Sequence, residues 1–301
     1  MRVFVTGATG FIGSRIVPEL IGAGHQVLGL TRSDAGARSL AAAGAQVQRG
    51  DLQDLEGLRS GAAAADAVIH TAFQRFQHFR DDWTRFAENC ELDKRVIEAI
   101  GVVLKGSNRP FIVSSGVGVA LGRAATEDDP PIPPSATYPR ASEATAAALM
   151  ERGLHVSVMR LPQVHDTMKQ GLVTPLIAIA RAKGVSAYVG DGLNGWPAAH
   201  VVDTARLYRL ALEKGTAGAR YHAVAEEGVP LKDIATVIGR GLNVPVISIS
   251  PEQAQEHFGF LGFFAGRDVQ TSSAQTRAKL GWNPAGPDLL TDLGNMHYMQ
   301  D

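Results

Sequence analysis

Three glycines stand at regular intervals near the start of the chain. The stretch TGATGFIG, residues 6–13, places Gly7, Gly10 and Gly13 directly after a short apolar run. In a strand-to-helix turn, one glycine allows a tight fold, a second lets a pyrophosphate approach the backbone, and a third packs the helix on the sheet. The free N–H groups of that helix then face the phosphates. The stretch therefore predicts a dinucleotide site, provided that a strand precedes it and a helix follows.

The end of the second predicted strand bears on which dinucleotide binds. This strand, QVLGL at residues 26–30, continues as Thr31 and Arg32. An acidic side chain in this region would accept hydrogen bonds from the ribose hydroxyls of NAD, whereas an arginine suits the 2′-phosphate of NADP. Because the acid is missing and a guanidinium is present, the sequence favours NADP over NAD.

The elements that must position these residues alternate between strand and helix. Strands are expected at 3–5, 26–30, 45–48, 67–72 and 110–115, with helices between them at about 11–23, 35–43, 54–62 and 82–100. An acidic, proline-rich loop at 124–139 precedes a helix at 140–152 and a strand at 155–161. Short apolar strands separated by helices predict an α/β fold with a doubly wound parallel sheet of the Rossmann type.

Beyond about residue 165, helices and short strands mix without this rhythm. We expect residues 1–164 to form the dinucleotide-binding domain. Residues 165–301 should form mainly a smaller C-terminal substrate lobe, with some segments returning to the sheet. Such a lobe would lie beside the carboxyl ends of the strands, where ligands bind in these folds. Within the first helix, Pro18 removes one hydrogen bond and should bend the helix without breaking it.

Composition excludes several classes of function. The 301 residues include 29 Lys and Arg against 30 Asp and Glu, so neither nucleic acid nor a membrane is an expected partner. One cysteine, Cys90, cannot form an internal disulfide, and the scattered histidines predict no metal site. The chain opens on MRVFVTG, with no basic and then apolar leader, so a cytoplasmic protein is expected.

Four later segments accompany the glycine turn. They are RGDLQD (49–54), VIHTAF (68–73), IVSSG (112–116) and RLPQV (160–164). Together with the spacing Gly-x-x-Gly-x-x-Gly, they resemble the short-chain dehydrogenase/reductase superfamily over nearly the whole chain. The likeness is to its extended branch, the NAD-dependent epimerases and dehydratases, and to atypical relatives of that branch. It implies a Rossmann fold, a nicotinamide cofactor and a small-molecule substrate.

The resemblance also implies cofactor contacts, position by position. By this correspondence the pyrophosphate would be held by Gly7, Thr9, Gly10, Phe11, Ile12 and Gly13. The adenine would meet Asp51 and Leu52, and the 2′-phosphate would meet Arg32. The ribose and nicotinamide would lie beside Thr71, Ala72 and Phe73, and the nicotinamide amide beside Leu161, Pro162 and Val164.

The stretch TYPRASE, residues 137–143, lies where the superfamily carries Tyr-x-x-x-Lys. In that motif the tyrosine exchanges a proton with the substrate, and the lysine lowers its pKa from about 10 toward working pH. Here Tyr138 is followed four residues later by Ser142. A neutral phenol can still protonate an alkoxide but is a poor base. The change should therefore weaken oxidation more than reduction.

Two interpretations of this stretch remain open. In the first register Tyr138 is either the proton donor or an aromatic wall of the pocket, and Pro139 fits the first turn of the next helix. In the second register Arg140 takes the lysine position, which puts Ala136 in place of the tyrosine and leaves no proton donor.

Further candidates come from the same resemblance. Ser115, preferred to Ser114, would hold the substrate oxygen, and Asp93 on the long helix resembles an acidic replacement for the asparagine that relays protons. Both also fit plain structural roles. Aromatic residues that could line an apolar pocket are Phe73, Phe76, Phe79, His165, Trp196, Phe263 and Phe264.

The leading interpretation is an NADP-dependent oxidoreductase that reduces a small, partly apolar carbonyl compound. A sugar-nucleotide epimerase or dehydratase is the nearest alternative, and a non-catalytic NADP-binding redox sensor is another. The alanine-rich helix at 141–150 and the long helix before it are where family members dimerise, so a homodimer is expected.

Overall fold

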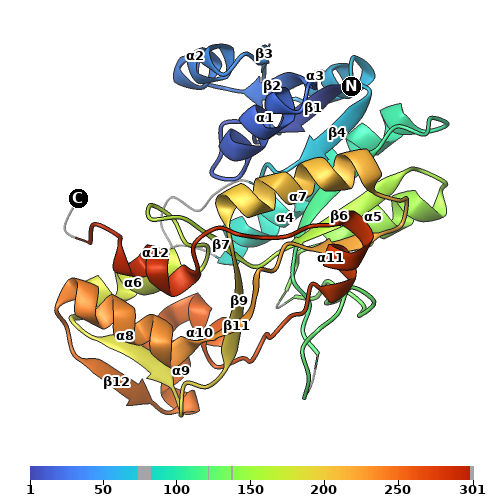
Figure 1. Ribbon diagram of the computed structural model, residues 1–301. Helices are drawn as coiled ribbons and strands as arrows, with labels where there is room; N and C mark the ends of the chain where they lie inside the picture. Colours follow the sequence, from blue (N-terminus) through green and yellow to red (C-terminus); the bar gives the residue numbers. More distant parts are fainter. Residues whose placement is uncertain (74–82, 121, 137, 299–301) are drawn as a thin grey trace.

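A parallel sheet of seven strands forms the centre of the larger part of the molecule (Figure 1). The computed structural model describes residues 1–73, 83–120, 122–136 and 138–298, so Phe76 and Phe79 lie outside the described residues. The strand order is β10-β6-β5-β4-β1-β2-β3. The strands are β1 (Arg2–Thr6), β2 (Gln26–Thr31), β3 (Gln46–Arg49), β4 (Ala67–His70), β5 (Phe111–Gly116), β6 (Val156–Leu161) and β10 (Arg220–His222).

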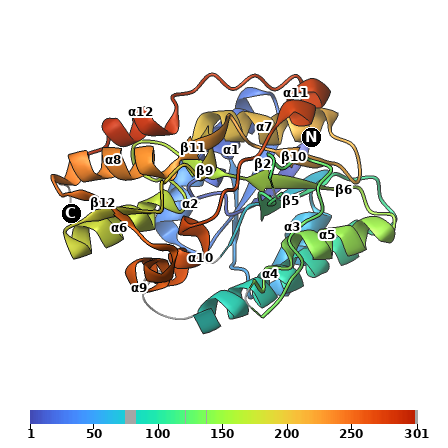
Figure 2. The same ribbon diagram turned by 90° about the horizontal axis from the view of Figure 1, so that it is seen from below.

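Helices cover both faces of this sheet, which confirms the doubly wound α/β fold (Figure 2). One face carries α1 (Gly13–Gly22), α2 (Asp34–Ala42), α7 (Val201–Lys214) and α11 (Ala274–Leu280). The other face carries α3 (Leu55–Ala63), α4 (Trp83–Leu104) and α5 (Ser142–Glu151). All pairings within the sheet are parallel.

Local sequence explains where the early helices begin. Ser33 caps α2, because its Oγ accepts the backbone N–H of Gly36 at 3.0 Å. Asp54 caps α3 in the same way, accepting from Gly57 at 2.9 Å. The helix α1 runs without interruption past Pro18, as expected.

The helix after the proline-rich loop begins later than the sequence suggested. It starts at Ser142, with Ala141 as its N-cap, so the expectation that Pro139 occupies its first turn is wrong. Residues 138–141 instead approach the helix as non-helical backbone, and Tyr138 exchanges backbone hydrogen bonds with Ser135. Tyr138 and Arg140 therefore stand before α5 and not on one of its faces.

A second, smaller lobe has its own apolar core, drawn below the large sheet in Figure 1. Its strands form a sheet of order β11-β9-β7 and a parallel pair, β12 with β8. Its elements are β7 (Gln163–His165), α6 (Val173–Lys183), β8 (Ser186–Val189), β9 (Gly195–His200), β11 (Glu226–Pro230), α8 (Leu231–Leu242), β12 (Val246–Ile249), α9 (Ala254–Phe258), α10 (Gly262–Ala265), α12 (Leu289–Gly294) and 3₁₀ turns at Pro251–Gln253 and Gly259–Leu261. Among the described residues, no helix combines the length and apolarity needed to cross a membrane.

Three elements beyond residue 164 belong to the larger part. Strand β10 extends the parallel sheet, and α7 packs with α1 on one of its faces. The helix α11 joins this layer through Leu280, and Trp282 just after it is buried there as well. The chain thus crosses between the two parts several times, so their relative positions are fixed at more than one point.

Asp203 on α7 anchors the segment that leads from α11 back to the second lobe. Its Oδ2 accepts the backbone N–H groups of Ala285 at 3.0 Å and Gly286 at 2.6 Å, and its side chain is 2% exposed. Its backbone carbonyl accepts the indole N–H of Trp282 at 3.0 Å. One carboxylate therefore fixes the path of a whole connecting segment.

We predict that Asp203→Ala lowers the free energy of unfolding by about 1–3 kcal/mol, because two backbone donors lose their acceptor. Arg206→Ala is the matched control, since Arg206 pairs with the same carboxylate from a more exposed position, at 3.4 Å. That control should cost less than about 1 kcal/mol. Urea unfolding of both variants measures the difference. Equal losses would show that Asp203 acts only through the ion pair.

Candidate functional site

The glycine turn has the close contacts that a dinucleotide cradle requires. Gly7 has a positive φ of 71°, and its carbonyl accepts the N–H of Gly10 at 2.8 Å. A Cβ on Gly13 would lie 2.0 Å from that carbonyl oxygen, and one on Gly7 would lie 2.7 Å from the backbone nitrogen of Ala72. Side chains are thus excluded where the backbone must approach a pyrophosphate at the N-terminus of α1. Thr9 is exposed beside this turn, and Phe11 and Ile12 are half-buried.

The end of β4 forms the neighbouring wall of this cradle. Thr71 follows β4 directly, and its hydroxyl donates to the carbonyl of Thr6 at 2.9 Å. Phe73 is half-buried and packs against Phe86 with ring centroids 6.2 Å apart. The segment from Thr71 to Phe73 therefore lies against the glycine turn, where a bound ribose and nicotinamide would pass.

The residues expected at the adenosine end lie at the carboxyl ends of β2 and β3. Thr31 is buried, whereas Arg32 beyond it is exposed to solvent. Asp51 is exposed, and its Oδ1 accepts the backbone N–H of Gln53 at 2.8 Å, so its carboxylate shapes its own turn. Leu52 is half-buried against the sheet core.

A large pocket of about 1030 Å³ opens between the carboxyl end of the sheet and the second lobe. The sheet side contributes Ser115, Gly116, Tyr138, Arg140, Leu161 and Pro162. The second lobe contributes mainly apolar and aromatic side chains, among them Leu172, Ile179, Trp196, Phe258, Phe260, Phe263 and Phe264. Expected site residues from three separate sequence segments thus meet in one cavity, whereas Val164 is buried in β7 beside it.

The two serines at the end of β5 have different surroundings. Ser114 donates to the carbonyl of His70 at 2.6 Å and lies 2.6 Å from the hydroxyl of Tyr208, so its hydroxyl is used inside the core. Ser115 lines the pocket, and its hydroxyl has no hydrogen-bond partner among the described residues. Of the pair, only Ser115 has a hydroxyl placed to meet a ligand.

Tyr138 is half-buried in the wall of the pocket, close to Gly116. Burial raises the pKa of its phenol above the ordinary value of 10, because the phenolate would lose hydration, and the nearby guanidinium of Arg140 offsets this only in part. The phenol is therefore neutral at pH 7 and carries a proton that it can donate.

Arg140 lines the same pocket and is held on three sides. Its Nε donates to the hydroxyl of Ser142 at 3.1 Å, and its Nη2 lies 3.4 Å from the carbonyl oxygen of Ser114. Its guanidinium carbon lies 4.8 Å from the ring centroid of Phe73, a cation–π contact. Tyr138 and Arg140 thus lie in one pocket wall, an arrangement that neither sequence register contained.

Asp93 is buried behind this wall and does not belong to the residues lining the pocket. Its Oδ1 lies 3.0 Å from Nε2 of His70, and its Oδ2 accepts the hydroxyl of Ser142 at 2.5 Å. Burial on its own would raise the pKa of Asp93, but the hydrogen bond and charge of His70, with Arg140 and Ser142, bring it below the ordinary value. Asp93 is therefore ionised and orients the hydroxyl of Ser142, which in turn accepts a hydrogen bond from Arg140.

A second buried network, which the sequence did not reveal, ties the proline-rich loop to the sheet. Arg160 on β6 is fully buried and donates to both carboxylate oxygens of Glu143, at 3.0 and 2.7 Å. It also donates to the carbonyl of Asp129 at 2.8 Å and lies 3.1 Å from Nε2 of His222. These contacts fix both ends of the loop that carries Tyr138. The sequence signal for this network is a charged residue, Arg160, inside a largely apolar strand.

His165, expected in the pocket, is instead part of a buried polar group in the second lobe. Its Nδ1 lies 2.7 Å from the carboxylate of Asp292, and its ring packs against that of His200 at 5.8 Å between centroids. Within the described part of the chain, no group of three or more histidine, cysteine or acidic residues is arranged to hold a metal ion.

Comparison with known proteins identifies a family that this chain matches. The family model described as "NAD dependent epimerase/dehydratase family" matches residues 3–225. An uncharacterized protein of Schizosaccharomyces pombe is 49% identical, over 99% of this chain and 100% of its own. The 4-hydroxy-2-methyl-3-oxo-4-farnesyl-3,4-dihydroquinoline-1-oxide ketoreductase of Stigmatella aurantiaca is 26% identical, over 98% of this chain and 97% of its own.

Solved structures share the fold. The UDP-glucose 4-epimerase of Thermus thermophilus, in complex with NAD, superposes with a TM-score of 0.72 at 22% identity and covers 99% of each chain. A family model that spans most of the chain and a relative of nearly 50% identity agree with the cradle, the sheet and the pocket described above. The chain belongs to the NAD-dependent epimerase/dehydratase family, whose cofactor is a nicotinamide dinucleotide.

Proposed function

We propose that this protein is an NADP-dependent reductase of a partly apolar carbonyl compound. The observation that carries the proposal is the shared pocket wall: a neutral phenol at Tyr138 and a free hydroxyl at Ser115 face a large cavity with apolar and aromatic walls. Such a cavity buries most of an apolar ligand, while a few polar groups orient its reactive end.

The relatives agree with a carbonyl as the reacting group. The ketoreductase of Stigmatella aurantiaca acts, by its name, on an oxo group of a farnesylated ring system. A sugar-nucleotide epimerase remains the nearest alternative, because proteins with that activity share the fold. The apolar lining contributed by the second lobe favours the carbonyl compound over a nucleotide sugar.

The residues of the chain suit the two halves of a carbonyl reduction. The backbone of Gly7, Gly10 and Gly13 would hold NADPH, which would supply the hydride that a carbonyl reduction requires. The hydroxyl of Ser115 would donate to the carbonyl oxygen and orient it. The phenol of Tyr138 would give its proton to that oxygen as the C=O π bond breaks, so that one C–H and one O–H bond form. Water then returns a proton to the phenolate.

Arg140 would assist this step as the cation of the site. Its guanidinium lowers the pKa of the Tyr138 phenol against the larger effect of burial, so it stabilises the phenolate that remains after proton transfer. Ser142 and Asp93 would act only through Arg140, as positioning residues, because the hydroxyl of Ser142 accepts from Arg140 and donates to Asp93 behind the pocket wall.

We predict that Tyr138→Phe lowers the rate of carbonyl reduction about 10²–10⁴-fold while NADP affinity holds, because only the donated proton is lost. Because the phenol has a pKa above 10, the Tyr138-dependent part of the wild-type rate should not fall between pH 7 and pH 9. NADPH oxidation with a panel of ketones, followed by absorbance, measures both effects.

Tyr188→Phe is the matched control for this substitution, because Tyr188 lies on β8 outside the pocket-lining residues and should tolerate loss of its hydroxyl. Unchanged reduction by Tyr138→Phe would make Tyr138 a pocket wall. If NADPH binds but no carbonyl is reduced, the redox-sensor alternative is preferred. Consumption of sugar nucleotides would instead favour the epimerase.

The preference for NADP rests on Arg32, which is exposed at the end of β2, whereas the nearby carboxylate of Asp34 is paired with Arg49. Arg32→Ala should weaken NADP binding by about 1.5–3 kcal/mol, the worth of a charge-assisted contact, and leave NAD binding unchanged. Arg59→Ala, which removes an equally charged side chain paired with Glu56 on α3, serves as the control. Calorimetric titration of both cofactors decides the matter, and an unaltered NADP affinity would exclude Arg32.

We further propose a homodimer formed through α4 and α5, which pack side by side on one face of the sheet. On α5, Ala144 and Ala148 are exposed, and their small side chains allow another helix to approach closely. Light scattering at micromolar concentration should give twice the mass of the chain, and Ala148→Arg should shift it toward the monomer. A monomeric wild type would refute this assembly.

A further inference from the structure

The charged residues of the large pocket all carry the same sign. Among the described residues that line it, the charged side chains are Arg140, Lys183 and Arg267, and none is Asp or Glu. Arg140 belongs to the wall that holds Tyr138, whereas Lys183 ends α6 and Arg267 follows α10 in the second lobe. A cavity with apolar walls whose charged side chains are all positive attracts and retains anions.

Arg267 is held in an orientation that suits an anionic ligand. Its guanidinium carbon lies 3.6 Å from the ring centroid of Phe263, which itself lines the pocket. Its side chain makes no hydrogen bond to the described residues. When a guanidinium stacks on an aromatic face, its N–H groups point outward along the guanidinium plane. There they can donate in pairs to a carboxylate or phosphate.

Lys183 supplies a second charge from the end of α6. Its ammonium donates to the carbonyl of Glu256 at 3.3 Å, which leaves two of its three N–H groups for a ligand. Lys183 therefore places positive charge on the same lobe as Arg267, away from the wall that carries Tyr138.

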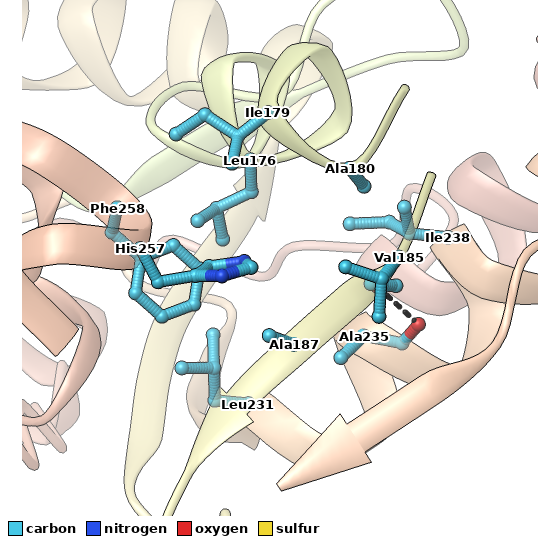
Figure 3. Close-up of a pocket in the computed structure, with 11 residues that line it drawn as sticks. Leu176, Ile179, Ala180, Val185, Ala187, Leu231, Ala235, Ile238, His257 and Phe258 are labelled. Carbon is cyan, nitrogen blue, oxygen red and sulfur yellow. Dashed lines mark hydrogen bonds between the residues drawn. The ribbon is translucent and has the colours of Figure 1, made fainter. Parts of the chain in front are cut away.

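His257 lies next to Lys183 but does not add to this charge. Burial, reinforced by the charge of Lys183, lowers the pKa of its imidazole, so the ring is neutral at pH 7. Figure 3 shows the ring pointing into a small apolar pocket between Leu176 and Leu231. Its Nε2 is buried there without a hydrogen-bond partner in the described structure. The anion would therefore be recognised by Lys183 and Arg267 and not by His257.

We propose that the ligand of this pocket is an amphiphile: an apolar carbonyl compound that carries an anionic group, which Arg267 and Lys183 bind while the carbonyl meets Ser115 and Tyr138. The assignment of the carbonyl end rests on the proposed reductase function. The assignment of the anionic end does not, because it concerns binding and requires no turnover. The aromatic and aliphatic walls between the two ends would contact the apolar part of the ligand.

The test compares decanoate with decan-1-ol, which share a chain length and differ in charge. Calorimetry with NADP present should show the acid binding about tenfold more tightly, since one charge-assisted contact is worth roughly that factor. The double variant Arg267→Gln/Lys183→Gln should lose about tenfold in affinity for decanoate and keep its affinity for the alcohol. Arg240→Gln is the charge-matched control, because Arg240 is exposed on α8 and does not line the pocket.

Three outcomes overturn the inference: equal affinity for acid and alcohol, an equal loss of affinity in the Arg240→Gln control, or no binding of either probe. Monodecyl phosphate, run beside decanoate, tells a phosphate-bearing ligand from a carboxylic acid, and preferential binding of either anion supports the proposal. Selective anion binding without carbonyl turnover would overturn the reductase function and leave this site intact. Carbonyl reduction without anion preference would do the reverse.

Discussion

The pocket wall depends on the contacts that the buried carboxylate of Asp93 makes. This carboxylate joins three elements, because it meets His70 from β4 and Ser142 from α5 while it stands on α4. The other ring nitrogen of His70 lies 2.7 Å from the hydroxyl of Thr6, at the strand end that begins the glycine turn. The hydroxyl of Ser142 in turn accepts a hydrogen bond from Arg140. One hydrogen-bonded chain thus runs from the dinucleotide cradle to the pocket, and its members must be satisfied together, since a half-satisfied buried network is costly.

This hydrogen-bonded series shows what Ser142 does at the position that the first register assigns to the lysine of Tyr-x-x-x-Lys. Ser142 is fully buried, and its hydroxyl both donates to Asp93 and accepts from Arg140. A lysine at this position would bring its ammonium against the Asp93 carboxylate, and the two charges would satisfy each other. Moving the cation to Arg140, two residues earlier and outside the helix, instead places it over Phe73 and beside Tyr138. The carboxylate remains paired, and a positive charge still reaches the pocket.

The parts of the structure that could be predicted from sequence are those set by local spacing. The glycine turn, the alternation of strand and helix and the continuity of α1 past Pro18 each depend on a few neighbouring residues. The contact between Asp93 and Ser142 joins residues 49 positions apart, so no local pattern reveals it. Local sequence also predicted Pro139 in the first turn of a helix, because the hydrogen bonds of Arg160 to Glu143 and to Asp129 of the proline-rich loop join residues too far apart for a local pattern to reveal them. The direction of Tyr138 and Arg140 follows from that tertiary contact and not from their spacing.

The balance of charge at Tyr138 separates the reactions that this family fold could support. An epimerase or dehydratase must first oxidise its substrate, and for this step the tyrosine must act as a phenolate base. With a pKa above 10, the phenol is ionised to less than about one part in a thousand at pH 7. Burial is the larger influence on this pKa, and Arg140 only moderates it. A reductase needs the opposite form, the neutral phenol, which is almost fully populated. In the proposed reductase, the burial that disfavours the phenolate would keep the proton in place for reduction, and the apolar lining of the same pocket would favour an apolar substrate.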